Sequence, residues 1–295
     1  MYETILVPLD GSKAAEMVIP YAMEIAARLD SQMILASVCD PSDVKAEQLY
    51  QAYLESLSKK VQSQIADWKP RKEKPVEKKI FSGKPAEEIL QYADDNDVAL
   101  IALTSFGASG RSHWFLGNNV ARILQSTIKP LLLIRAPANE ASLKQNKLFK
   151  RILLPLDGSE IGAVAVPYSE LLAQALGAEL VLFQVVEPLK PPMVGSDVNF
   201  PFNAPALDEE KRADSAIYLN GVAERFRKWG FKVSTVVVSG SPANQIIDYA
   251  KANAIDLIAM SSHGRTGLGR WVFGSVTDKV LHAGDTPVLV IHPKP

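Results

Sequence analysis

The residues best suited to chemistry lie in the second half of the chain. Ser261, His263 and Gly264 follow a predicted strand, and Gly274 and Ser275 stand where a predicted helix over 275–283 begins. Glycines let a ligand approach the backbone closely, and a helix N-terminus offers unpaired N–H groups with a partial positive charge. A serine there can cap the helix or bind an anion. This arrangement predicts a phosphate site.

Asp157 is the second candidate, because it ends the first predicted strand of the same half and precedes Gly-Ser. Its carboxylate could accept hydrogen bonds from ribose hydroxyls, and a bond of this charge-assisted type is worth roughly 1.5–3 kcal/mol. Asp-Gly-Ser is also a common turn composition, so a purely structural turn stays open. Together with a phosphate site, a sugar-binding carboxylate indicates a nucleotide.

The chain is an internal repeat. The segment TILVPLDGS at 4–12 recurs as RILLPLDGS at 151–159, and later matches such as Gly117 with Gly274 keep the same order. About ten extra residues in the second copy must lie between 188 and 211, a stretch rich in Pro, Gly and Asn that predicts a loop. The polar segment 138–150 is the expected linker between a domain at 1–137 and a domain at 151–295.

Within each copy, apolar runs of strand length alternate with segments of helical periodicity, among them 14–29, 118–126 and 275–283. This alternation predicts a doubly wound α/β fold with a five-stranded parallel sheet in each copy. Ligands of such sheets bind beyond the strand C-termini, where the winding direction switches. The last strands of the two copies would be apolar edges, so we expect them to pair as an intrachain pseudo-dimer, with a homodimer also open.

These motifs resemble those of the universal stress protein family in its tandem two-domain form, and the resemblance covers nearly the whole chain. It implies Rossmann-like domains of strand order 3-2-1-4-5 that bind an adenine nucleotide, ATP or AMP. Nucleotide-binding members carry Gly-x2-Gly-x9-Gly-Ser/Thr and an Asp after the first strand. The resemblance implies ribose at Asp157, adenine near Val185 and Met260, and phosphates at the glycine motif. The predicted site is Pro155, Leu156, Asp157, Val185, Met260, Ser261, His263, Gly264, Arg265, Gly274, Ser275 and Val276.

The sequence departs from the family motif in both copies. Ser261 replaces the first glycine, which would cost roughly 1–2 kcal/mol if that position needs left-handed geometry. The first copy departs further, with Thr104 and Phe106 in the motif and a pair of asparagines at the helix start. We therefore rank its possible second nucleotide site below the first; that site consists of Asp10, Gly107, Gly117 and Asn118.

Composition excludes several other classes of protein. The 32 basic and 33 acidic residues nearly cancel, so no basic excess indicates a nucleic-acid or membrane-surface partner. A single cysteine allows no intramolecular disulfide, no Cys/His set has zinc spacing, and no acidic pair predicts a metal site. The chain shows no signal-peptide pattern and no apolar run of membrane-spanning length. We expect a cytoplasmic protein.

The leading functional hypothesis is a stress-response protein that binds ATP or AMP and regulates unidentified protein partners, without being an enzyme. Slow ATP hydrolysis, or Mg²⁺ or Mn²⁺ held through the phosphates, could accompany binding. One alternative is a nucleotide-free protein-interaction module that has lost the ability to bind nucleotide. The other is a nucleotide-using enzyme, which the absence of Gly-x-x-x-x-Gly-Lys-Ser/Thr and Gly-x-Gly-x-x-Gly disfavours.

Overall fold

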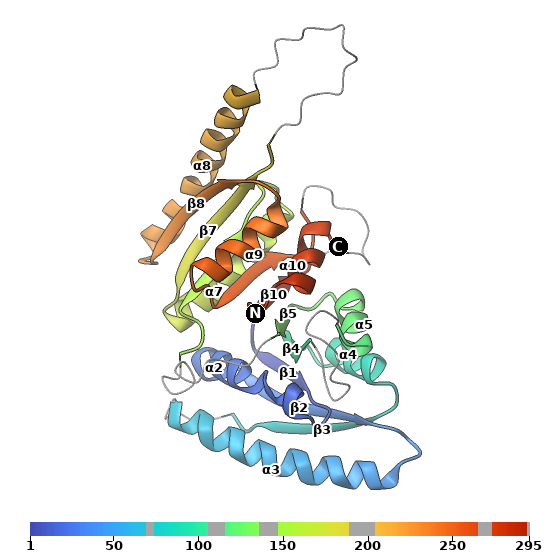
Figure 1. Cartoon of the computed structure of the whole chain (residues 1–295). Coiled ribbons are helices and arrows are strands. Elements are labelled where there is room, and N and C mark those ends of the chain that lie inside the picture. Colours follow the sequence, from blue (N-terminus) through green and yellow to red (C-terminus); the bar gives the residue numbers. More distant parts are fainter. Residues whose placement is uncertain (69–73, 106–115, 136–146, 189–203, 265–272, 294–295) are drawn as a thin grey trace, which may run out of the picture.

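The computed structural model describes residues 1–68, 74–105, 116–135, 147–188, 204–264 and 273–293 (Figure 1). The first half contains, in chain order, β1 (Thr4–Pro8), α1 (Lys13–Glu16), α2 (Ile19–Leu29), β2 (Gln32–Cys39), α3 (Val44–Trp68), β3 (Glu77–Ser82), α4 (Pro85–Asp95), β4 (Leu100–Thr104), α5 (Asn118–Ser126) and β5 (Leu131–Ile134). The second contains β6 (Arg151–Pro155), the 3-10 helix η1 (Gly162–Ala165), α7 (Val166–Leu176), β7 (Glu179–Val186), α8 (Ala204–Lys228), β8 (Val233–Ser239), α9 (Pro242–Ala252), β9 (Leu257–Ser261), α10 (Ser275–Ala283) and β10 (Val288–Ile291).

The strands form one ten-stranded sheet in the order β3-β2-β1-β4-β5-β10-β9-β6-β7-β8. Pairing is parallel within each half, and the halves meet where β5 and β10 pair antiparallel, with Leu133 opposite Val288 and Leu131 opposite Val290. The intrachain pairing of the last strands is therefore confirmed, and it merges two five-stranded parallel sheets into one. Pairing satisfies backbone N–H and C=O groups that two apolar edges would otherwise expose.

Helices cover both faces of this sheet, as its strands require. Strands β4, β5, β9 and β10 are buried along their whole length, a pattern typical of parallel strands covered on both sides. One core cluster joins the sheet to α2, α3, α7 and α8, and the other joins it to α4, α5, α9 and α10. Each cluster contains residues of both halves, so the core is continuous across the chain. No helix in the described ranges is long and apolar enough to cross a bilayer.

Two local predictions were wrong. The helix predicted over 14–29 is divided into α1 and α2, and Pro20 lies in the first turn of α2, where its missing N–H costs little. The predicted loop over 188–210 is helical from Ala204, since Pro205 falls in the first turn of α8. Residues 189–203 of that loop and 138–146 of the predicted linker lie outside the described residues.

The end of the linker is part of the core. Leu148 and Phe149 are 4% and 0% exposed, and two carboxylates hold the chain around them. Leu148 N donates to Glu24 Oε2 of the first half at 2.7 Å, and the amides of Lys150 and Arg151 both donate to one carboxylate oxygen of the second half at 2.9 Å, namely Asp256 Oδ2. Burial raises the pKa of the Glu24 carboxyl to about 7, although the Leu148 and Phe149 amides and the Arg28 and Lys147 charges oppose the rise.

This burial makes the contribution of Glu24 to stability depend on pH. Its folded-state pKa of about 7 lies above its ordinary value of 4.5, so the folded protein retains a proton that the unfolded chain releases. The stabilisation is complete below pH 4.5 and is lost as the pH rises through about 7. Over this window the loss is about 3 kcal/mol.

Replacing Glu24 by glutamine should remove that loss. Urea unfolding between pH 4.5 and 8 should show the stability of Glu24→Gln gaining about 3 kcal/mol relative to the original protein as the pH rises. Glu210→Gln, at an exposed position of α8, is the control and should follow the original protein. Parallel pH profiles for Glu24→Gln and the original protein would show that the Glu24 carboxyl does not retain its proton on folding.

Candidate functional site

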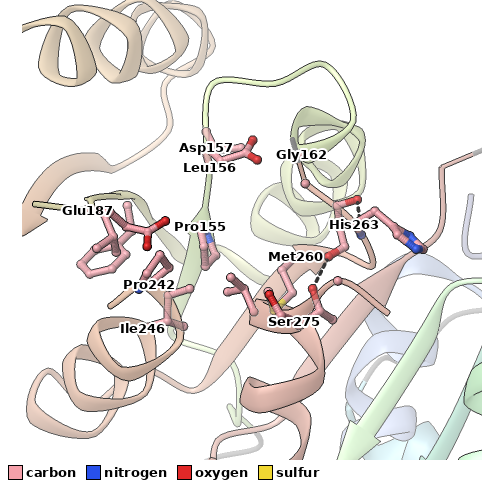
Figure 2. Close-up of a pocket in the computed structure, with 17 residues that line it drawn as sticks. Pro155, Leu156, Asp157, Gly162, Glu187, Pro242, Ile246, Met260, His263 and Ser275 are labelled. Carbon is pink, nitrogen blue, oxygen red and sulfur yellow. Dashed lines mark hydrogen bonds between the residues drawn. The ribbon is translucent and has the colours of Figure 1, made fainter. Parts of the chain in front are cut away.

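A cavity of about 290 Å³ lies in the second half, between the C-terminal ends of β6, β7 and β9 and the N-terminus of α10 (Figure 2). This is the position where a doubly wound sheet binds ligands. Of the twelve predicted site residues, Arg265 lies outside the described residues. The other eleven line the cavity: Pro155, Leu156, Asp157, Val185, Met260, Ser261, His263, Gly264, Gly274, Ser275 and Val276. Sequence reasoning missed six other lining residues, which are Gly162, Phe183, Glu187, Pro242, Ile246 and Thr277.

One end of the cavity is formed by the first turn of α10. Gly274 is the N-cap and has no side chain to cap the helix, and no described residue accepts a hydrogen bond from the backbone N–H of Ser275 or Val276. Such N–H groups at a helix start can bind an anion. With φ −59° and ψ 145°, Gly274 has no left-handed geometry. A Cβ there would lie 3.5 Å from the Ser262 carbonyl oxygen, an ordinary van der Waals contact, and this oxygen accepts the Gly274 N–H.

Ser261 fits its position without backbone strain. It is the last residue of β9, and the described non-glycine residues with positive φ are Asp30, Asp97 and Ala254. The cost that left-handed geometry would impose on a serine therefore does not arise. The Ser261 carbonyl oxygen instead accepts a 2.8 Å hydrogen bond from Thr277 Oγ1, which ties the start of α10 to the end of β9.

Asp157 serves both as a turn residue and as part of the cavity wall. Its Oδ1 accepts hydrogen bonds from Ser159 N at 3.0 Å and Ser159 Oγ at 2.6 Å, and Gly158 supplies the φ of +85° that this turn needs. Two further glycines make room for the carboxylate. A Cβ on Gly162 would lie 2.4 Å from Oδ1, and one on Gly264 would lie 2.5 Å from Oδ2.

The opposite end of the cavity is mainly apolar, apart from the Glu187 carboxylate. Phe183 and Ile246 line it, and Phe183 packs on Tyr249 with ring centroids 4.8 Å apart. Figure 2 shows Glu187, Pro242 and Ile246 at this end, His263 and Ser275 at the other, and Asp157 on the upper wall. The cavity thus has a mainly apolar end that also holds the Glu187 carboxylate, the Asp157 carboxylate on its wall and a helix N-terminus at the far end.

His263 lies at the helix end of the cavity, where its Nδ1 shares a 2.9 Å hydrogen bond with Ser262 Oγ. The Ser262 side chain is fully buried, so this bond fixes the imidazole at the rim. Within the described ranges, no group of three or more His, Cys, Asp or Glu side chains is placed to hold a metal ion.

The first half has a corresponding cavity of about 400 Å³, lined by Asp10, Gly117 and Asn118 among others. Gly107, the fourth residue predicted for this second site, lies outside the described residues. Ala36 replaces Phe183 in the lining and Ala15 replaces Gly162. This cavity is therefore wider at its apolar end and has a methyl group where the other leaves space for the aspartate.

Two of the missed residues, Gly162 and Thr277, differ in type from their counterparts in the first copy of the repeat. At the same offset of 147 that relates Asp157 to Asp10, Gly162 corresponds to Ala15 of the first copy. A difference between copies beside a shared aspartate could have drawn attention to it. Thr277 likewise corresponds to Val120 of the first copy, at the offset of 157.

Comparison with known proteins gives one family for both halves. The profile of the universal stress protein family matches residues 1–135 and again 148–292. A universal stress protein of Methanocaldococcus jannaschii is 32% identical over 144 residues, which cover 49% of this chain and 82% of the relative. Another, from Synechocystis, is 25% identical over 97% of this chain and 99% of the relative.

A solved structure agrees with the fold. The crystal structure of a universal stress protein from Archaeoglobus fulgidus superimposes with a TM-score of 0.70 at 20% identity, and the match covers 99% of each chain. At that identity the likeness supports the fold. The family profile matches two consecutive segments that together cover nearly the whole sequence, and the chain therefore belongs to the universal stress protein family, in the tandem form with two copies of the domain.

Proposed function

We propose that the second-half cavity binds an adenine nucleotide, ATP or AMP, and that the protein acts in the cytoplasm as a nucleotide-dependent regulator of stress-response partners. The observation that carries the proposal is the order of groups along one cavity. A mainly apolar end that includes Glu187, the Asp157 carboxylate and a helix N-terminus without a side-chain cap follow one another in the order of base, ribose and phosphate in a nucleotide.

Each part of the nucleotide has a matching group. The base packs against Phe183, Val185 and Met260, and the ribose hydroxyls donate to the Asp157 carboxylate. The phosphates accept N–H bonds at the first turn of α10 and lie beside Gly264, Gly274, Ser275 and Val276. Any Mg²⁺ or Mn²⁺ would be held mainly by phosphate oxygens, because the described residues form no cluster of metal ligands.

The first-half cavity is the weaker candidate for a nucleotide. Asn118 and Asn119 stand at its helix start, where they put amide side chains in place of the Ser275 and Val276 side chains of the second half. We therefore assign one strong nucleotide site to each chain, and we propose binding rather than catalysis as its role.

The direct test is to find the nucleotide. Protein purified without added ligand and released into denaturant should yield adenine nucleotide, and calorimetric titration of emptied protein with ATP and AMP should show one tight site. A protein that releases no nucleotide and binds neither ligand would instead favour the protein-interaction module. Turnover of ATP at a catalytic rate would favour an enzyme.

Gly274→Asp should abolish ATP binding in the second half. The new carboxylate would stand beside the phosphates, and such like-charge contact costs several kcal/mol, which weakens binding by more than about 100-fold. Calorimetry measures the loss. The matched control is Gly117→Asp, the same change at the equivalent helix start of the first half, which should leave the tight site intact. Undiminished affinity in folded Gly274→Asp would refute the phosphate assignment.

Gly264→Ala tests the ribose contact. Its methyl group would lie 2.5 Å from Asp157 Oδ2, so the carboxylate must move. Losing that charge-assisted bond should weaken ATP and adenosine binding by about 10- to 100-fold. Free adenine has no ribose and should bind as before. Gly221→Ala is the control, since a Cβ there meets nothing within 4 Å. Equal losses for adenosine and adenine would contradict the assignment of ribose to Asp157.

A further inference from the structure

Helix α10, whose first turn lines the second-half cavity, is held at both ends. At its start, Gly274 N donates to the Ser262 carbonyl at 2.9 Å and Thr277 Oγ1 donates to the Ser261 carbonyl at 2.8 Å. At its other end, the Leu281 carbonyl lies in the last turn, where carbonyls lack partners within the helix. This buried carbonyl accepts a hydrogen bond from the guanidinium Nη1 of Arg135.

Arg135 belongs to the first half of the chain. It directly follows β5, the strand that pairs with β10 across the centre of the sheet (Figure 1). The residue is only 3% exposed, and the preceding Ile134 carbonyl accepts a 2.9 Å bond from Ser105 N, so its backbone is fixed in the first-half sheet. A buried cation at a helix C-terminus interacts favourably with the helix dipole, and its bond to the carbonyl is charge-assisted.

The equivalent helix of the first half, α5, has the same backbone anchor at its start, from Gly117 N to the Ser105 carbonyl at 2.9 Å, but its sequence lacks counterparts of Thr277 and Arg135. The position that corresponds to Arg135 is His292 after β10, at an offset of 157, and Val120 corresponds to Thr277. Burial lowers the pKa of His292 to about 4, so it carries no charge at neutral pH. Its Nε2 has no hydrogen-bond partner among the described residues. The Thr277 hydroxyl and the Arg135 guanidinium therefore anchor α10, the helix at the better-preserved site, and have no counterparts at α5.

We propose that Arg135 is a positioning residue for the second-half site. By holding the C-terminal end of α10 from across the sheet, it fixes the N-terminal turn where the phosphates bind. The first copy thus supplies a residue that supports the site of the second copy, in addition to any ligand that the first-half cavity binds. This inference rests on the proposed function for its binding measurement, but the anchoring of α10 is testable without a ligand.

The binding test compares ligands with and without phosphate. In Arg135→Met, which keeps the apolar bulk but has neither charge nor donor, ATP affinity should fall by roughly three- to tenfold, because positioning of the phosphate turn is worth no more than the bond that holds the helix. Adenosine affinity should not change, since adenosine does not reach the first turn of α10. Arg135→Lys, with a charge and a donor, should stay close to the original affinity. The matched control is Arg122→Met, at an exposed arginine of α5.

The second measurement is amide hydrogen exchange over residues 275–283 without ligand. Exchange there should be faster in Arg135→Met than in Arg122→Met. If the original protein binds no ATP, the proposed function fails, and the exchange data alone decide whether Arg135 holds the helix. Unchanged exchange in α10, or equal losses of ATP and adenosine affinity, would overturn the inference. Arg135→Gln, which has a donor but no charge, replaces the methionine variant if that variant does not fold, with the same two readouts.

Discussion

The antiparallel pairing of β5 with β10 is the contact that gives the molecule its single sheet and its continuous core. Each strand has four buried residues and would be an apolar edge of its own half. Edges of this kind are prone to pair with other chains. Pairing them inside one chain creates a ten-stranded sheet and lets both core clusters run from one half into the other. It also places the end of β5 beside α10, which makes the Arg135 contact geometrically available.

This pairing relates the two halves symmetrically, but their cavities are chemically different. The second has the aromatic wall of Phe183 and the space left by Gly162, where the first has two alanines. The connection between the copies adds a further asymmetry. Its last residues bind one carboxylate of each half, because the Leu148 amide donates to Glu24 and the Lys150 amide donates to Asp256. The repeat therefore gives two similar frames whose cavity walls and helix starts differ at a few positions.

Glycine has two separate uses around the second-half cavity. At Gly158 the backbone is left-handed, and the residue is needed for its conformational freedom. Gly264 has no positive φ, and it matters because a side chain there would collide with Asp157. This distinction explains why a serine can stand at the first position of the family motif. That position lies at the end of a strand and needs no left-handed geometry.

Local signals in the amino-acid sequence were enough to establish the repeat, the alternation of strands and helices, and the two helices over 118–126 and 275–283, because periodicity and glycine punctuation act over short distances. They also identified most of the cavity lining, since strand ends and helix starts converge in this fold. The contacts of Glu24 with Leu148 and of Arg135 with Leu281 became visible only in the folded chain. These partners lie 124 and 146 residues apart, and no local pattern encodes a contact created by folding one half against the other.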